Sequence, residues 1–190
     1  MIRSITTLIV FLFLISQVTF SQDLMLNNAE SSLTVSGTSS LHDWNIKGQM
    51  FKGEGSFIFD NEHLKMIFEL TFEVVVAQLK ADKDGMNKTI QKALKAAQQP
   101  TITYKFEKLI LLTEVDLYTY TAETSGFLTI AGLTKPINLL FNISVLNHKI
   151  RFKGTKNLKM SDFNIDPPKA MLGMLKSGNE ILVKFDVVYQ

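Results

Sequence analysis

The segment Gly126-Phe-Leu-Thr-Ile-Ala-Gly-Leu-Thr-Lys-Pro136 decides the fold, because it predicts two half-buried strands joined by a tight turn. Gly132 can adopt the positive φ that such a turn requires. Pro136 has no backbone N–H to donate, so we expect it where a strand begins. Beyond it, apolar side chains recur at every second position from Ile137 to Val145, which is the period of a strand with one buried face.

The same two-residue period recurs along most of the chain. It marks segments near residues 33–35, 57–59, 68–76, 102–106, 118–122, 150–152 and 181–189. Antiparallel strands have this pattern when one face meets the core and the other meets solvent. Closing such strands into a barrel leaves no exposed sheet edge. We therefore predict an all-β fold, an antiparallel β-barrel of about eight strands that is wide enough inside for one small ligand.

One segment has helical rather than strand spacing. Between Lys83 and Pro100 the apolar residues are Met86, Ile90, Ala93, Leu94 and Ala97. Offsets of four, seven, eight and eleven place them on one face of a helix. We predict a short helix at about 86–98, with Asp84 or Asn87 as its N-cap and Pro100 as its stop.

The first 21 residues resemble a secretory signal peptide rather than part of the fold. Arg3 precedes an apolar run from Ile5 to Ile15, which is too short to span a bilayer about 30 Å thick. Thr19 and Ser21 are small residues suited to a cleavage site. We expect cleavage between Ser21 and Gln22, one barrel domain over 22–190, a secreted or periplasmic location and no transmembrane anchor after cleavage.

The composition excludes several function classes. The chain of 190 residues has 20 Lys and Arg against 18 Asp and Glu, spread without a basic run, which argues against binding to nucleic acid. It has no cysteine, so disulfides, thiol catalysis and cysteine zinc sites are ruled out. The segment around Asp82 fails as a calcium loop, because Lys80 and Gln91 would take positions that need carboxylates. We expect no metal and no cofactor.

His42-Asp43-Trp44 is the one candidate for general-base chemistry. Adjacent strand residues point to opposite faces, so His42 and Asp43 are poorly placed for a proton relay. We expect a hydrogen-bonded strand or turn role for His42, packing for Trp44 and no catalytic residue.

An apolar barrel interior could bind a ligand or could be filled by its own side chains, and alternation does not distinguish the two. Alternation selects the side chains that would line a ligand site. The candidates are Phe68, Leu70, Phe72, Tyr104, Phe106, Leu139, Phe141, Ile143 and Phe185. Some of them must serve only as core.

Three motifs, in their order along the chain, resemble the YceI-like family. They are Ser36-Gly-Thr-Ser-Ser-Leu-His-Asp-Trp44, the Gly126–Pro136 segment and Met160-Ser-Asp-Phe-Asn-Ile-Asp-Pro-Pro168. Gln99-Pro-Thr-Ile-Thr-Tyr-Lys-Phe106 and Lys176-Ser-Gly-Asn-Glu180 also resemble family segments. The chain departs from the family at Asn164, where many relatives carry glycine, and at Asn179, where aspartate is common. Both are turn positions that asparagine tolerates.

The resemblance implies an extended, lipocalin-like barrel that holds a polyisoprenoid or similar amphiphilic, long-chain lipid, with no enzymatic activity. The alternative from the residues is a structural or protein-interaction module of the cell envelope, with a side-chain-filled barrel and no ligand. A homodimer is left open by the sequence. A cavity larger than about 300 Å³ would favour the lipid carrier.

Overall fold

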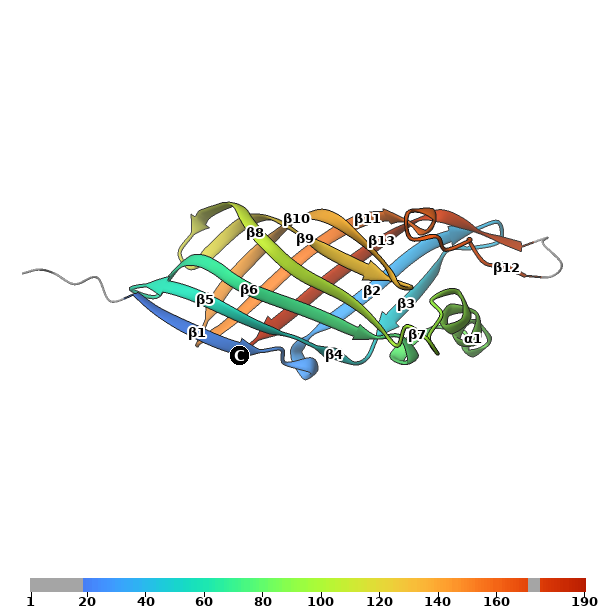
Figure 1. Ribbon diagram of the computed structural model, residues 1–190, viewed down its shortest axis with the longest axis horizontal. Coiled ribbons are helices and arrows are strands. Elements are labelled where there is room, and N and C mark those ends of the chain that lie inside the picture. The colour runs from blue at the N-terminus through green and yellow to red at the C-terminus, as the bar shows by residue number, and fades with distance from the viewer. Residues whose placement is uncertain (1–18, 171–174) are drawn as a thin grey trace, which may run out of the picture.

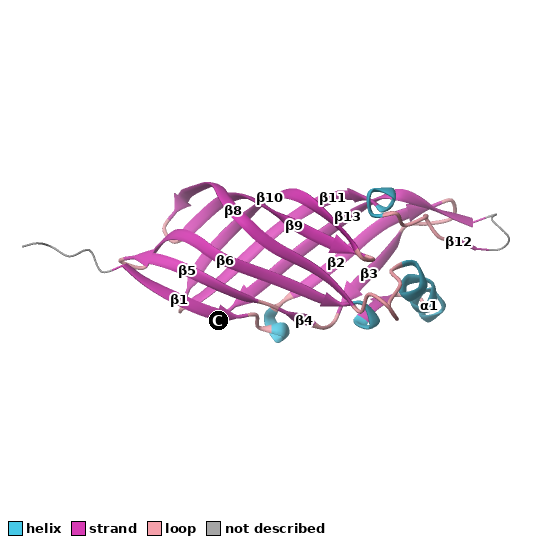
Figure 2. Ribbon diagram, in the orientation of Figure 1, coloured by secondary structure: helices cyan, strands magenta, loops and turns pink. Residues whose placement is uncertain are grey.

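Strands make up most of the protein in the computed structural model, which describes residues 19–170 and 175–190 (Figure 2). In chain order the strands are β1 (Thr19–Met25), β2 (Ser32–Ser39), β3 (Trp44–Gly48), β4 (Phe51–Lys52), β5 (Glu54–Asp60), β6 (His63–Val75), β7 (Leu79–Ala81), β8 (Thr101–Asp116), β9 (Thr119–Ile130), β10 (Leu133–Leu146), β11 (Lys149–Lys159), β12 (Lys169–Ala170) and β13 (Leu175–Tyr189). The helices are α1 (Asp84–Ala93) and the short 3₁₀ helices η1 (Asn28–Glu30), η2 (Val76–Gln78) and η3 (Met160–Phe163).

The strands form one antiparallel sheet that curls on itself (Figure 1). Its order is β1-β5-β6-β8-β9-β10-β11-β13-β2-β3-β7. At one end Leu26, just after β1, bridges to Tyr189 of β13. At the other end β4, which follows β3, pairs with β6. These two contacts close the barrel, and the predicted all-β antiparallel barrel is confirmed.

The number of strands differs from the prediction. The described part of the chain has thirteen strands, against the expected total of about eight. The strands that the two-residue period did not mark are β1, β3, β4, β7 and β12. β4 with 2 residues, β7 with 3 and β12 with 2 contain too few positions to show a period. β1 begins inside the segment that was predicted to be a signal peptide. The circuit that closes at Leu26 and Tyr189 contains eight strands, β1, β5, β6, β8, β9, β10, β11 and β13.

The turn at Gly132 is confirmed, but the prediction for Pro136 was wrong. Gly132 has φ +85° in the turn between β9 and β10. Pro136 lies inside β10 and pairs with Phe127 of β9. On its other side β10 is paired with β11 only from Phe141 onward, so no β11 ladder is present at Pro136 to lose a donor.

The helix is confirmed in place, although its limits differ. It spans Asp84–Ala93 rather than 86–98, and its N-cap is Lys83, not Asp84 or Asn87. The Asn87 side chain instead accepts a hydrogen bond from the backbone N–H of Ala81, at 2.9 Å. Lys95 has φ 54°, a left-handed conformation that ends the helix before Pro100.

The predicted signal peptide falls mostly on residues 1–18, outside the described residues. β1 begins at Thr19 and pairs with β5 as far as Met25, opposite Glu54. The predicted cleavage point between Ser21 and Gln22 therefore lies within this strand. A chain cut there would keep Gln22–Met25 as its contribution to the pairing.

One end of the barrel is filled by a buried core. It contains Leu24, Phe57, Phe59, Leu64, Ile67, Leu70, Tyr120, Ala122, Phe141, Ile143, Ile150, Phe152, Val187 and Tyr189. Phe152 lies at the centre of a ring cluster, with its centroid 5.9 Å from Phe57 and 5.5 Å from both Phe141 and Tyr189. The Tyr189 hydroxyl donates to the Thr71 carbonyl at 2.6 Å, and burial raises the pKa of that hydroxyl. Aromatic packing therefore closes this end.

Gly53, between β4 and β5, tests how closely the backbone there approaches β6 and β13. A Cβ atom there would lie 2.4 Å from the Thr71 carbonyl oxygen and 2.9 Å from the Tyr189 hydroxyl. We expect Gly53→Ala to lower the free energy of unfolding in urea by about 1–3 kcal/mol, because backbone must shift. Gly85→Ala is the control, since nothing lies within 4 Å of a Cβ there and a helical alanine should stabilise by about 0.5–1 kcal/mol. Equal effects of the two substitutions would contradict the close approach.

Candidate functional site

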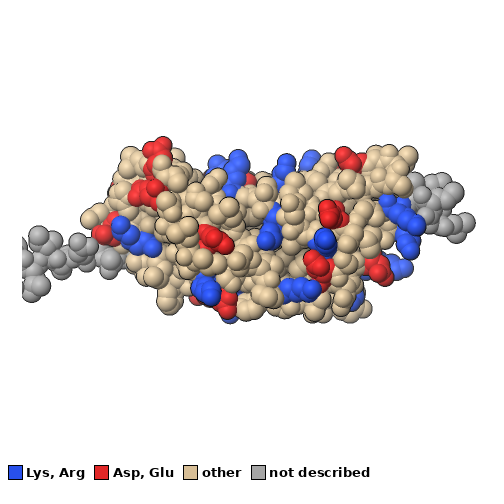
Figure 3. Space-filling view, turned by 90° about the horizontal axis from the view of Figure 1, so that it is seen from above, with Lys and Arg blue, Asp and Glu red and all other residues tan. Residues whose placement is uncertain are grey.

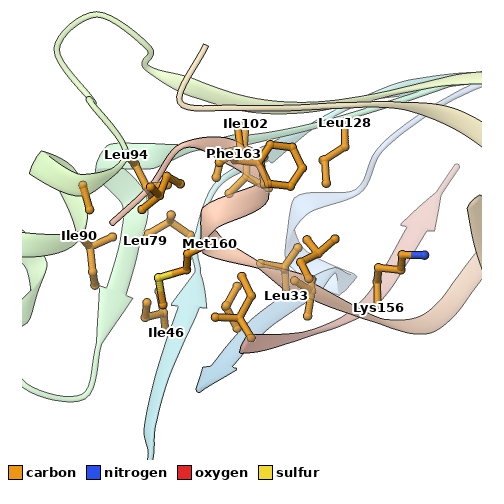
Figure 4. Close-up of a pocket in the computed structure, with 18 of the residues that line it drawn as sticks. Leu33, Ile46, Leu79, Ile90, Leu94, Ile102, Leu128, Lys156, Met160 and Phe163 are labelled. Carbon is orange, nitrogen blue, oxygen red and sulfur yellow. The ribbon is translucent and has the colours of Figure 1, made fainter. Parts of the chain in front are cut away.

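The opposite end of the barrel, beside α1, contains a cavity of about 510 Å³. Its lining comes from inward-facing residues of the sheet, from α1 and from η3. Leu33, Ile46, Leu79, Ile90, Leu94, Ile102, Leu128, Met160 and Phe163 surround it, and Figure 4 shows their side chains gathered around one space. This volume is within the roughly 300–1,000 Å³ that ligand pockets occupy. The barrel is thus packed at one end and hollow at the other.

Trp44, the only tryptophan of the chain, lines this cavity and is 9% exposed. Its indole N–H donates to the Thr38 carbonyl at 2.9 Å and to the Ser177 hydroxyl at 3.0 Å. Gly37 leaves room for the ring, because a Cβ there would lie 2.2 Å from it. The predicted packing role of Trp44 is confirmed.

His42 lies in the turn between β2 and β3 at the mouth of the cavity. Its Nδ1 lies 2.9 Å from the Asp43 carbonyl oxygen, and its Nε2 lies 3.1 Å from the Lys83 ammonium. These contacts hold the ring in a turn, as predicted. Among the residues that the structure describes, no group of three or more histidine or carboxylate side chains could hold a metal ion.

The charged side chains that line the cavity, counted over the described residues, are all lysines. They are Lys83, Lys156, Lys159, Lys169 and Lys176. A neutral polar pair lies deeper, where the Tyr104 hydroxyl and the Thr124 hydroxyl are 3.2 Å apart. Burial raises the pKa of Tyr104, so this phenol stays protonated. The cavity therefore combines an apolar interior with cationic groups.

Six of the predicted lining residues do face the cavity. They are Leu70, Phe72, Tyr104, Leu139, Phe141 and Phe185. Phe106 and Ile143 instead pack in or against the core at the closed end, with Ile143 fully buried. Phe68 was wrongly placed, because its side chain lies on the outside with 69% of its surface exposed. Whether the six bind a ligand stays a prediction.

Irregular pairing in β6 explains the error at Phe68. Phe57 of β5 pairs with Ile67, whereas Ser56 pairs with Glu69, so Phe68 has no partner of its own. Such a bulge inserts one residue and reverses which face the next side chain meets. The buried positions of β6 consequently run Leu64, Ile67 and Leu70 at a spacing of three. A strict two-residue period cannot describe this strand.

Other lining residues were not among the predicted ones. They are Val35, Ile46, Ile181 and Val183 from β2, β3 and β13, and Met86, Ile90 and the C-cap Leu94 from α1 and its end. The alternation of β13 was visible in the sequence and could have found Ile181 and Val183. The apolar face of the helix was visible in the sequence, but its contact with the cavity, like that of η3, depends on tertiary packing.

A second, smaller cavity of about 380 Å³ opens in the barrel wall between β10 and β11. The two strands pair from Phe141 with Gly154 up to Leu146 with Lys149, and not beyond Gly154. The unpaired stretches leave a slit lined by Glu123, Asn138, Leu139, Leu140, Thr155, Lys156 and Asn157. Leu139 and Lys156 line both this slit and the main cavity.

The chain matches the model of the YceI-like domain over residues 24–189, nearly its whole length. It belongs to that family, and the resemblance in its motifs is confirmed. No curated protein matches the chain.

Solved structures share the fold at low sequence identity. Burkholderia cenocepacia BcnA is 16% identical with a TM-score of 0.68, covering 86% of this chain and 98% of BcnA. A polyisoprenoid binding domain from Saccharophagus degradans, implicated in plant cell wall breakdown, is 13% identical with a TM-score of 0.66, covering 88% and 97%. The Campylobacter jejuni YCEI protein is 20% identical with a TM-score of 0.56, covering 75% and 82%. At these identities the likeness establishes the barrel fold.

Surface features add little to the site itself. Within the described residues, no helix has the length and apolar character needed to cross a membrane. Lys and Arg are interspersed with Asp and Glu over the face drawn in Figure 3. That face therefore has no extended area of a single charge.

Phe72 and Phe68 are a matched pair for testing which residues face inward. Phe72 lines the cavity and stacks on Phe51, with ring centroids 5.7 Å apart, whereas Phe68 is exposed. We expect Phe72→Ala to lower the free energy of unfolding by about 2 kcal/mol and Phe68→Ala to change it by less than about 0.5 kcal/mol. Urea denaturation of both variants measures the difference. A larger loss of unfolding free energy in Phe68→Ala than in Phe72→Ala would show that Phe68, and not Phe72, faces inward.

Proposed function

We propose that this protein is a secreted or periplasmic carrier that holds the apolar tail of a polyisoprenoid or similar amphiphilic lipid inside the barrel. The observation that carries the proposal is the apolar cavity of about 510 Å³, placed in a fold whose relatives include a polyisoprenoid binding domain. The signal-like sequence of residues 1–21 supports the location.

Burial of the tail supplies the binding energy. Each methylene removed from water contributes about 0.8 kcal/mol, so ten contribute about 8 kcal/mol before the costs of association. Most of the lining is apolar, and its polar side chains other than the lysines and Trp44 are Ser39, His42, Thr89, Tyr104, Ser177 and Tyr189. Tail recognition therefore depends mainly on shape and length. Broad specificity among apolar chains follows.

The role is non-enzymatic in this proposal. His42, the one candidate base, faces the Asp43 carbonyl and Lys83 rather than a carboxylate. No nucleophile or cofactor is needed for the function. The competing role, a filled envelope module, is less well supported because the interior beside α1 is hollow.

Extraction of a native ligand tests the carrier proposal directly. Protein purified from the organism that makes it, extracted with organic solvent and analysed by mass spectrometry, should release a prenyl or acyl lipid. Protein denatured and refolded without lipid is the control and should release none. An extract of the native protein that matches this control would refute the proposal.

Filling the cavity should abolish binding without unfolding the barrel. Val183 faces the cavity from the middle of β13, so Val183→Phe adds bulk where space is present. We expect affinity for an added acyl or prenyl chain, followed by Trp44 fluorescence, to fall at least about tenfold, while the melting temperature stays unchanged or rises. Leu111→Phe, at an exposed site of β8, is the control and should leave affinity unchanged. Full affinity in Val183→Phe would place the ligand elsewhere.

A further inference from the structure

Among the lysines that line the cavity, Lys156 lies in an inward-facing row of a barrel strand. On β11 it continues the inward row of Phe152 and Leu158, and its cross-strand partner on β13 is Val183. All four side chains line the main cavity. Lys156 is half-buried at this position, so its ammonium group lies beside apolar side chains and still reaches the surface of the wall.

Within the described residues, the Lys156 ammonium has one hydrogen-bond acceptor and no carboxylate to neutralise its charge. Its ammonium donates to the Asn138 backbone carbonyl at 2.7 Å. Over the described residues, none of the salt bridges joins Lys156 to a carboxylate. A neutral carbonyl satisfies one of the three donors of the ammonium and leaves its charge unneutralised. The group is therefore able to bind an anion.

The slit between β10 and β11 gives this ammonium a way to meet solvent. Lys156 and Leu139 line both the slit and the main cavity, so the two spaces meet at these side chains. In Figure 4 Lys156 lies at the edge of the apolar group, at one end of the space that the other labelled residues surround. Pro136 lies on the part of β10 that pairs with β9 but not with β11, and it has no backbone N–H to donate.

We propose that this slit is a second opening of the lipid cavity, and that Lys156 binds there the oxyanion of the ligand's head group, a carboxylate or a phosphate. The inference rests on the proposed function, because the tail must occupy the cavity for its head to reach Lys156. The ligand class is thereby narrowed to anionic amphiphiles, with the head at the side wall and not at the mouth beside α1.

Other charged residues around the cavity are alternative sites for an anionic head group or would repel it. Glu123 is the one carboxylate of the slit lining, and its Oε1 lies 3.5 Å from the Asn138 side-chain nitrogen. At the mouth, Lys83 contacts His42, and Lys159 lies 3.9 Å from Glu180. Lys169 and Lys176 face each other across β12 and β13. These mouth lysines are the competing site for an anionic head.

Three probes with the same ten-carbon chain separate head from tail: decanoate, decyl phosphate and 1-decanol. Lipid-free protein is titrated with each, followed by calorimetry and by Trp44 fluorescence. We expect Lys156→Gln to weaken binding of the two anions about tenfold, about 1.4 kcal/mol, and to leave 1-decanol unchanged. Lys156→Arg should retain most of the anion affinity. The anion that loses more identifies carboxylate or phosphate as the preferred head.

Two control variants locate the effect. Lys105→Gln removes the same charge from an exposed position on β8 and should change nothing. The triple variant Lys83→Gln, Lys169→Gln, Lys176→Gln removes charge from the mouth and should have a smaller effect than Lys156→Gln. A larger loss in the triple variant would overturn the side-wall site. Equal losses for decanoate and 1-decanol in Lys156→Gln would also overturn it, because packing and not charge would then explain the change.

Backbone amide spectra test the position without any substitution. Decanoate should shift the amide signals of Leu140, Thr155 and Asn157 more than 1-decanol does, while Ser39 at the mouth responds to both alike. Identical shifts at the slit would overturn the proposal and leave the carrier function intact. Failure of the wild-type protein to bind any of the three probes would overturn the carrier function, and this inference with it.

Discussion

The packed aromatic end of the barrel is the constraint on which the rest depends. A hollow interior forfeits the contacts that normally hold a fold together, and native proteins are stable by only about 5–15 kcal/mol. Here the stability lost beside α1 is offset by the cluster around Phe152, with Phe57, Phe141 and Tyr189 in edge or tilted contact. The same strands extend from one end to the other. Strand length thus lets one sheet serve as core at one end and as container at the other.

The general fold could be predicted because its signals are local. The turn at Gly132, the alternation of β10 and the inward row of β13 each arise from neighbouring residues, and the structure bears them out. Details that depend on pairing could not be predicted. Phe68 follows its neighbours in a regular period, yet the bulge that turns it outward is set by how β6 meets β5. Pro136 was misplaced for the same reason, since its tolerance depends on where β11 stops pairing.

The residues of the candidate site also divide into those that local sequence signals predict and those that depend on strand pairing or packing. Leu70, Phe72, Tyr104, Leu139, Phe141 and Phe185 were found because inward facing is a property of the strand itself. Phe106 and Ile143 also face inward, but they lie at the filled end, and the sequence does not reveal where filling gives way to space. Lys156 was missed because a lysine within an alternating strand is expected to face solvent. Its place in the wall became apparent only from the register of β11 with β13.

The position of β13 has a consequence for how the barrel folds. Residues 175–189 lie between β11 and β2 in the sheet, and their far end also meets Leu26. β13 lies far from β2 along the chain, so β2 gains this neighbour only through a contact between distant segments. Contacts between such distant segments form slowly. Until β13 is in place, β2 has only β3 beside it and the wall between β2 and β11 stays open, so this one strand completes the container.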